Sequence, residues 1–142
     1  SADDLYRNQS TFMVEMMETA TILKHATERS FVIMDEIGRG TTPEDGIAVA
    51  FACLHHLYHV NKCRTLFATH FHAVGDMSRH MEKVGYWCTD VAEDQSGGFS
   101  YMHKLKRGVN RKSHSLKVAR LAGLPEAAID IAQKVLDGGP VK

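Results

Sequence analysis

The chain has 142 residues, of which 44% are hydrophobic and 24% are charged, a composition typical of one globular domain. Its 17 basic and 17 acidic side chains balance, which argues against a general polyanion-binding surface. No apolar run is long enough to span a bilayer, so we expect no membrane association. The three cysteines, Cys53, Cys63 and Cys88, lack CxxC spacing, which favours reduced thiols in an intracellular protein.

The first predicted element is an amphipathic helix. Residues 3–9 are polar and predict a loop, after which apolar residues recur at spacings of three and four from Phe12 to Thr27. Ser10 would then be the N-cap, where free backbone amides favour an anion such as phosphate. The alternative is an ordinary capping serine without a ligand. The exposed side of this helix should include Glu15.

A short apolar run at residues 31–34 predicts a strand that is buried on both faces. Asp35 and Glu36 follow directly, at the carboxyl edge where open α/β sheets bind ligands. Placing two charged side chains at the end of a buried strand costs free energy unless they have a use. They could hold a hydrated metal ion and orient a water molecule. The pair predicts the Walker B half of an ATPase site; the alternative is a strand that ends in two solvated acids.

The next elements predict a parallel βαβ unit. Thr42 is a suitable N-cap for a helix that runs to about His59, and residues 64–70 form a second short strand ending in His70. The two carboxylates and this histidine would then lie at one edge of the sheet. A purely structural histidine is the alternative. Residues 72–83 should form a short helix.

The C-terminal part predicts a hairpin followed by two helices. Residues 84–91 and 99–106 have the pattern of paired strands. From Ser113 the period is helical, breaks at residues 123–125 and resumes to Val135, which predicts a helix-turn-helix.

Two further features have alternative interpretations. Five clustered histidines would suit either a zinc site or an exposed helix face; they are His55, His56, His59, His70 and His72. The stretch 104–120 is basic and would suit either phosphate contact or a solvated surface.

Four blocks, in this order and spacing, resemble the ATPase domain of the MutS mismatch-repair family, which belongs to the ABC ATPase superfamily. They are residues 10–16 (STFMVEM), 35–41 (DEIGRGT), 65–70 (TLFATH) and 121–125 (LAGLP), and the match covers about residues 3–136. The resemblance implies an α/β fold with a partial P-loop ABC ATPase sheet and flanking helices over residues 1–110. A helix-turn-helix dimerisation element and tail would occupy residues 111–142.

The resemblance also implies an ATPase that uses ATP and Mg²⁺. Ser10, with Thr11 beside it, would reach the nucleotide of a partner protomer as the signature serine. Asp35 would hold Mg²⁺ through water, and Glu36 and His70 would be the catalytic residues near the γ-phosphate.

The implied partners are a second MutS-type chain, in a homodimer or a heterodimer with a paralogue, mismatched double-stranded DNA bound by other domains, and a MutL-type protein. Blocks 26–30 and 63–67 suggest a fungal homologue, located in the mitochondrion or the nucleus.

The dimer interface would include Gly38, Arg39, Gly40, Thr41, Ser113, Leu116, Leu121 and Pro125.

The sequence departs from the family pattern at two places. The phosphate-binding motif G-x-x-x-x-G-K-[ST], which the family carries upstream, is absent, so this chain alone should hydrolyse ATP negligibly. His114 and Ser115 replace an expected aromatic residue and glycine.

Two other functions would account for parts of the sequence. Another ABC-type ATPase of chromosome maintenance or transport would show Ser-Gly-Gly at its signature. A helix-turn-helix DNA-binding module is disfavoured by the zero net charge and by Glu126 and Asp130 in the second helix.

Overall fold

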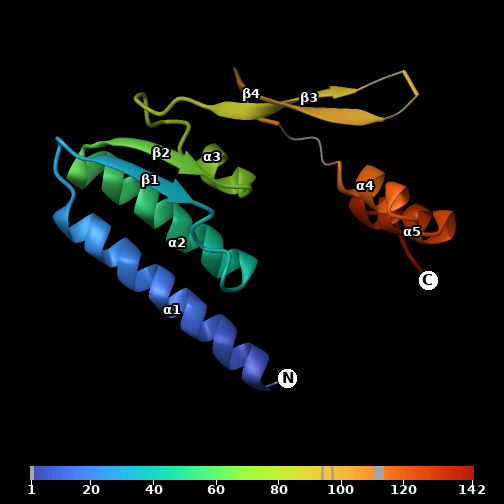
Figure 1. Ribbon diagram of the computed structural model, residues 1–142, viewed down its shortest axis with the longest axis horizontal. Coiled ribbons are helices and arrows are strands. Elements are labelled where there is room, and N and C mark those ends of the chain that lie inside the picture. The colour runs from blue at the N-terminus through green and yellow to red at the C-terminus, as the bar shows by residue number, and fades with distance from the viewer. Residues whose placement is uncertain (1, 94, 97, 111–113) are drawn as a thin grey trace. The chain divides into compact units, whose positions relative to one another are not determined.

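The computed structural model describes residues 2–93, 95–96, 98–110 and 114–142. Among them are five α-helices and two two-stranded sheets (Figure 1), in two compact units, Ser1–Val84 and Gly85–Lys142. The predicted mixed α/β class is therefore confirmed, whereas the larger P-loop sheet and the boundary near residue 110 stay predictions. In the described part of the chain, no helix has the length and apolar character needed to cross a membrane.

Helix α1 spans Ala2–His25, so the predicted loop at residues 3–9 and the predicted N-cap at Ser10 are wrong. Ser10 lies roughly two turns inside the helix. Residues 3–9 contain neither glycine nor proline, so their sequence has no strong helix breaker. A polar composition therefore did not prevent the helix from starting earlier.

Strands β1 (Phe31–Asp35) and β2 (Arg64–Ala68) pair in parallel, as predicted, with Asp35 opposite Ala68. Helices α1 and α2 (Pro43–His56) supply apolar side chains to the core on the Val32 and Met34 face. The prediction that β1 is buried on both faces is wrong. Val32 and Met34 are 6% and 2% exposed, but Phe31 and Ile33, on the opposite face, are 62% and 63% exposed.

Side-chain hydrogen bonds cap the start of α2 and satisfy carbonyls at the end of α1. Thr42 caps α2 as predicted, its hydroxyl accepting a hydrogen bond from the Asp45 amide at 3.4 Å. After α2, a π-helix at Leu57–Asn61 presents the buried Asn61 to the end of α1. The Asn61 amide donates to the carbonyls of Leu23 and Ala26 at 2.9 and 3.0 Å. These bonds satisfy two carbonyls that the end of α1 would otherwise leave unpaired.

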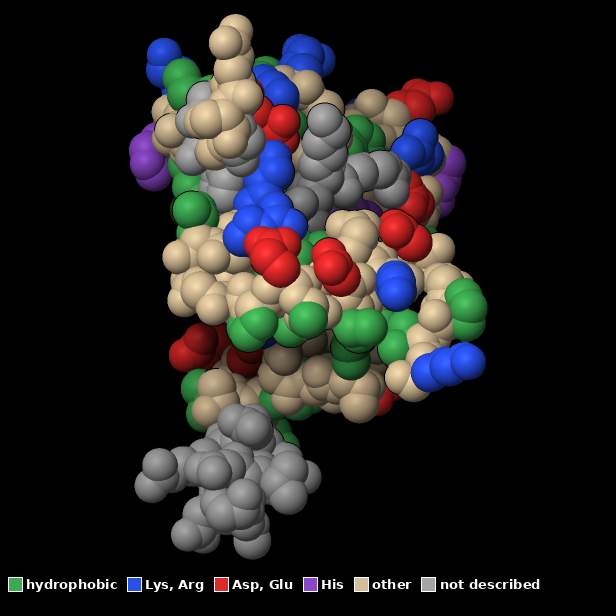
Figure 2. Space-filling model, turned by 90° about the vertical axis from the view of Figure 1, so that its right-hand side faces the viewer, with side chains coloured by type: hydrophobic (Ala, Val, Ile, Leu, Met, Phe, Trp, Pro, Cys, Tyr) green, Lys and Arg blue, Asp and Glu red, His purple; other side chains and the backbone are tan. Residues whose placement is uncertain are grey.

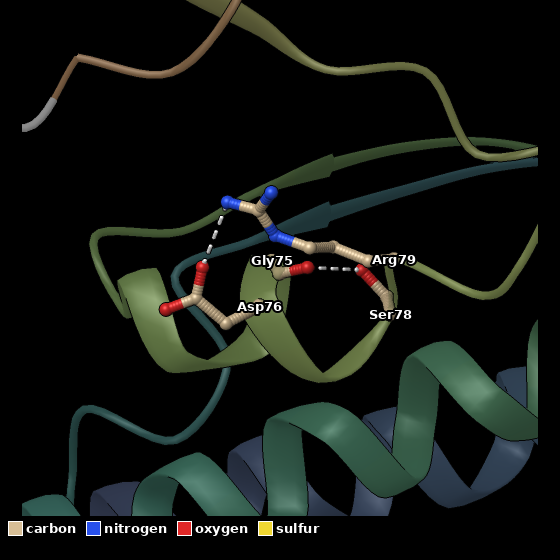
Figure 3. A network of polar contacts seen from close by, with 4 residues as sticks. All are labelled: Gly75, Asp76, Ser78 and Arg79. Carbon is tan, nitrogen blue, oxygen red and sulfur yellow. Dashed lines mark hydrogen bonds and ion pairs between the residues drawn. The ribbon is translucent and has the colours of Figure 1, made fainter.

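Helix α3 spans only His72–Met77, so the predicted helix over residues 72–83 ends early. The Ser78 hydroxyl donates to the Gly75 carbonyl at 3.0 Å, and Arg79 pairs with Asp76 at 3.3 Å (Figure 3). The serine hydroxyl competes for a carbonyl of the last turn, which favours termination there.

The second unit contains the predicted hairpin. Strands β3 (Trp87–Glu93) and β4 (Phe99–Arg107) are antiparallel, with an irregularity between Thr89 and Val91. Two helices joined by a turn follow, α4 (Ser115–Leu121) and α5 (Glu126–Leu136), close to the predicted ranges. Arg120 and Glu126 form an ion pair across that turn at 2.8 Å.

Candidate functional site

The carboxyl ends of β1 and β2 form one edge, as the sequence predicted. The Glu36 amide donates to the Ala68 carbonyl at 2.9 Å, which extends the pairing one residue beyond β1. Asp35, the last residue of β1, carries an exposed side chain. A carboxylate at the exposed end of a fixed strand can bind a hydrated Mg²⁺ ion, which keeps several of its water ligands. The geometry of Asp35 therefore fits the metal role that the resemblance implies.

Glu36 and His70 meet at this edge. The Glu36 Oε1 and His70 Nε2 atoms lie 3.2 Å apart, with the glutamate side chain 23% and the histidine side chain 74% exposed. Glu36 has a φ of 56°, a left-handed conformation that is uncommon for a residue with a side chain. The structure thus brings together the two residues predicted to be catalytic, while their roles remain predictions.

The loop after Glu36 is held by close backbone contacts. Gly38 has a φ of +95°, and a Cβ atom there would overlap the Gly46 carbonyl oxygen. Gly40 approaches α1, since a Cβ atom at Gly40 would lie 3.0 Å from Phe12 Cβ. In the loop that joins β1 to α2, a side chain at Gly38 would overlap backbone atoms, whereas one at Gly40 would require Phe12 to shift slightly. A dimer-interface role for Gly38, Arg39, Gly40 and Thr41 stays a prediction.

Glu15 contacts the same loop, which the sequence analysis missed. Its Oε1 atom accepts a hydrogen bond from the Gly38 amide at 3.0 Å. The expectation that Glu15 lies on the exposed side of the helix is wrong, because the residue is half-buried. The available signal was its spacing: Glu15 is three residues after Phe12 and beside Met16, so it falls on the apolar stripe of α1.

Cys53 lies in the core near this contact and is 5% exposed. Burial, followed by the negative charge of Glu15, raises the pKa of the Cys53 thiol above its ordinary value. The thiol is therefore held neutral, which suits a packing residue and not a nucleophile.

Ser10 and Thr11 both belong to α1. The backbone of Ser10 is helical, but its side chain lies outside what the structure describes. Thr11 is exposed, one residue before the Phe12 that packs against Gly40. Their proposed contact with a nucleotide stays a prediction.

The histidines are distributed in a way that offers little to a zinc ion. His55 and His59 have ring centroids 4.3 Å apart on one side of α2 and the π-helix. Within the described residues, no group of three or more histidine, cysteine or acidic side chains could hold a metal ion. Structural zinc needs four such ligands, which the pair alone does not supply.

The two C-terminal helices leave apolar side chains in solvent. Figure 2 shows hydrophobic side chains at the surface of the molecule among charged ones. Leu121 is 78% and Leu136 66% exposed, Leu116 is half-buried and Pro125 is exposed. Ser113, a predicted interface residue, lies outside the described residues. A role of Leu116, Leu121 and Pro125 in a dimer interface stays a prediction.

Comparison with known proteins identifies relatives along nearly the whole chain. A family model described as MutS domain V matches residues 1–138. Proteins named DNA mismatch repair protein MutS are 48% identical in Azorhizobium caulinodans, 47% in Cereibacter sphaeroides and 42% in Wolbachia pipientis wMel. Each match covers 96% of this chain but only 14%, 16% and 16% of the respective relative.

Proposed function

Because the chain belongs to the MutS family, in which it corresponds to domain V, we propose that it forms part of an ATPase that acts in DNA mismatch repair. In the full-length protein, ATP binding and hydrolysis would be coupled to recognition of mismatched double-stranded DNA by other domains. The chain spans about a seventh of the length of the relatives it matches, so these activities belong to the larger protein.

The contact between Glu36 and His70 at the carboxyl edge, 3.2 Å long, is the observation that carries the proposal. Asp35 would hold Mg²⁺ through water, and the ion would neutralise charge on the ATP phosphates. The Glu36 carboxylate would orient the attacking water, and His70 would stand between that carboxylate and the γ-phosphate. Their arrangement at neighbouring strand ends supports this division of roles.

The proposed site is shared between two chains. Ser10 and Thr11 of one protomer would approach the nucleotide held by the edge residues of the other, giving two composite sites in a homodimer or a heterodimer with a paralogue. The apolar surface on α4 and α5 supports a dimerisation role for that element. A MutL-type protein would bind the assembled dimer. This function requires an intracellular location beside DNA, in the mitochondrion or the nucleus if the host is a eukaryote.

The phosphate-binding motif is absent from this sequence, so the activity must be measured in the full-length protein. There, Glu36→Ala should leave ATP binding intact and lower kcat by about 100-fold or more, because the water loses its orienting base. Equilibrium binding of ATP and release of phosphate measure the two effects separately.

The matched control is Glu82→Ala, which removes an exposed carboxylate from the same compact unit. Its kcat should equal that of the wild type. Hydrolysis by Glu36→Ala at the wild-type rate would overturn the assigned role.

A further inference from the structure

Glu15 joins α1 to the loop that follows the proposed catalytic glutamate. Its Oε1 atom accepts the Gly38 amide proton at 3.0 Å, across 23 residues of sequence. The carboxylate is half-buried, where its charge is costly unless a donor satisfies it. A hydrogen bond to an ionised acceptor is also stronger than one between neutral groups. Glu15 is therefore a specific connection and not a solvated surface acid.

A second contact from α1 acts at the same loop. Phe12, one turn before Glu15, packs so closely on Gly40 that a Cβ atom there would lie 3.0 Å from Phe12 Cβ. From the other side, Gly38 is pressed against the backbone of Gly46 in α2. The loop therefore has little room to shift unless α1 shifts with it.

The position of this loop bears on Glu36. Gly38 is only two residues after Glu36, which has a left-handed φ of 56° and whose carboxylate lies 3.2 Å from His70. A displacement of the Gly38 amide changes the chain direction immediately after Glu36. The 3.2 Å contact between Glu36 and His70 should therefore respond to movement of α1.

We propose that Glu15 is a positioning residue that couples α1, the helix carrying Ser10, to the Glu36 and His70 pair of the same chain. This inference rests on the proposed function, in which Ser10 acts at the partner's nucleotide. When ATP fills one composite site, it changes the position of the α1 helix whose Ser10 contacts it. Glu15 then transmits this change in position to Glu36 and His70 of the other site. Each chain thus links the two sites of the dimer through one hydrogen bond.

The test uses a full-length mixed dimer in which one protomer carries Glu36→Ala, so that only one site turns over. Its single-turnover rate is measured with ATP filling one site and with ATP filling both, and the ratio of the two rates reports the coupling. With wild-type Glu15 in the active protomer, the ratio should differ from one by about fivefold or more. Glu15→Leu, which keeps the side-chain bulk but lacks an acceptor, should bring it close to one.

Two variants separate coupling from folding. Glu15→Gln retains an acceptor oxygen and should restore most of the ratio, and Glu18→Leu changes an exposed carboxylate on the same helix and should leave it unchanged. If Glu15→Leu does not fold, hydrogen exchange of the wild-type residues 37–42 replaces it. Exchange at Gly38 should change when the analogue AMP-PNP fills the partner's site.

The outcomes distinguish a failure of the proposed ATPase function from a failure of the coupling role of Glu15. A wild-type protein that hydrolyses no ATP overturns the proposed function, and the inference falls with it. An active protein whose ratio is the same with Glu15→Leu, or whose Gly38 exchange is indifferent to AMP-PNP, overturns the coupling role of Glu15 alone.

Discussion

Glu36 combines a left-handed backbone conformation with the contact to His70 on which the proposed function rests. Its φ of 56° costs a residue with a side chain about 1–2 kcal/mol relative to the right-handed conformation. The surrounding structure holds this conformation through the Glu36 amide, bonded to Ala68 at 2.9 Å, and through the fixed loop at Gly38. Such strain is tolerated where neighbouring contacts over-determine the backbone, as they do at many functional sites.

Gly38 offers a direct test of that loop. Gly38→Ala should lower the free energy of unfolding of the chain by at least about 2 kcal/mol, because strain at φ +95° adds to an overlap of the new Cβ atom with the Gly46 carbonyl oxygen. Urea unfolding followed by circular dichroism measures the change.

Gly123 provides the matched control for this substitution. Its φ of +98° is nearly the same, but nothing lies within 4 Å of a Cβ atom there. Gly123→Ala should therefore cost only the conformational strain, about 1 kcal/mol. Equal losses for the two variants would show that the approach of Gly38 to Gly46 does not constrain the loop.

At the scale of elements, the β1–β2 sheet has one covered and one open apolar face. Val32 and Met34 pack against α1 and α2, whereas Phe31, Ile33 and Leu66 are 62%, 63% and 60% exposed. Strands with apolar residues on both faces are typical of parallel sheets that are covered on both sides. The apolar residues on both faces of β1 therefore predict a further layer of structure over the Phe31 and Ile33 face, which α1 and α2 do not cover.

Substitution of Ile33 tests whether the open face is covered in the larger protein. Ile33→Lys should hardly change the melting temperature of the chain alone, because a lysine there is solvated. In the full-length protein the same change should lower the melting temperature of this domain by several degrees, because it would bury an unpaired charge. Differential scanning calorimetry of both forms gives the comparison.

Met34→Lys distinguishes the two faces in the same experiment. Met34 is 2% exposed, so a lysine there should destabilise the chain and the full-length protein alike. If Ile33→Lys is harmless in both forms, the open face stays in solvent and its apolar character needs another explanation.

For the whole molecule, we propose that two chains associate through exposed apolar side chains of α4 and α5. Leu121, at the end of α4, is 78% exposed, and Val135 and Leu136 near the end of α5 are 61% and 66% exposed. The high exposure of these three apolar side chains supports the proposal that a partner covers them. A dimer would remove them from water.

Leu121→Asp in the full-length protein should weaken that dimer by tenfold or more, since it would place a charge in an apolar contact; about 1.4 kcal/mol corresponds to each factor of ten. Sedimentation velocity over a range of concentrations measures the dissociation constant. Val141→Asp, an equivalent change in the tail beyond α5, should have little effect. A dimer equally stable with both variants would remove α4 from the interface.

The sequence by itself determined the features that depend on neighbours in the chain. Apolar runs and periods of three and four predicted β1, β2, the hairpin and the two C-terminal helices, and local capping chemistry predicted Thr42 at the start of α2. The order of strand, helix and strand also placed Glu36 and His70 at one sheet edge, since parallel strands end on the same side. These signals are local, so they could be read from the chain without coordinates.

Only the tertiary structure decided which side chains of those elements meet. Residues 3–9 joined α1 because their polar composition does not oppose a helix, and β1 buried one face because α1 and α2 both lie on that face. The Glu15 contact with Gly38 spans 23 residues, and it joins a loop that begins at a left-handed Glu36 and packs closely at Gly38 and Gly40. Contacts between distant residues follow from the packing of whole elements, which no local pattern in the sequence specifies.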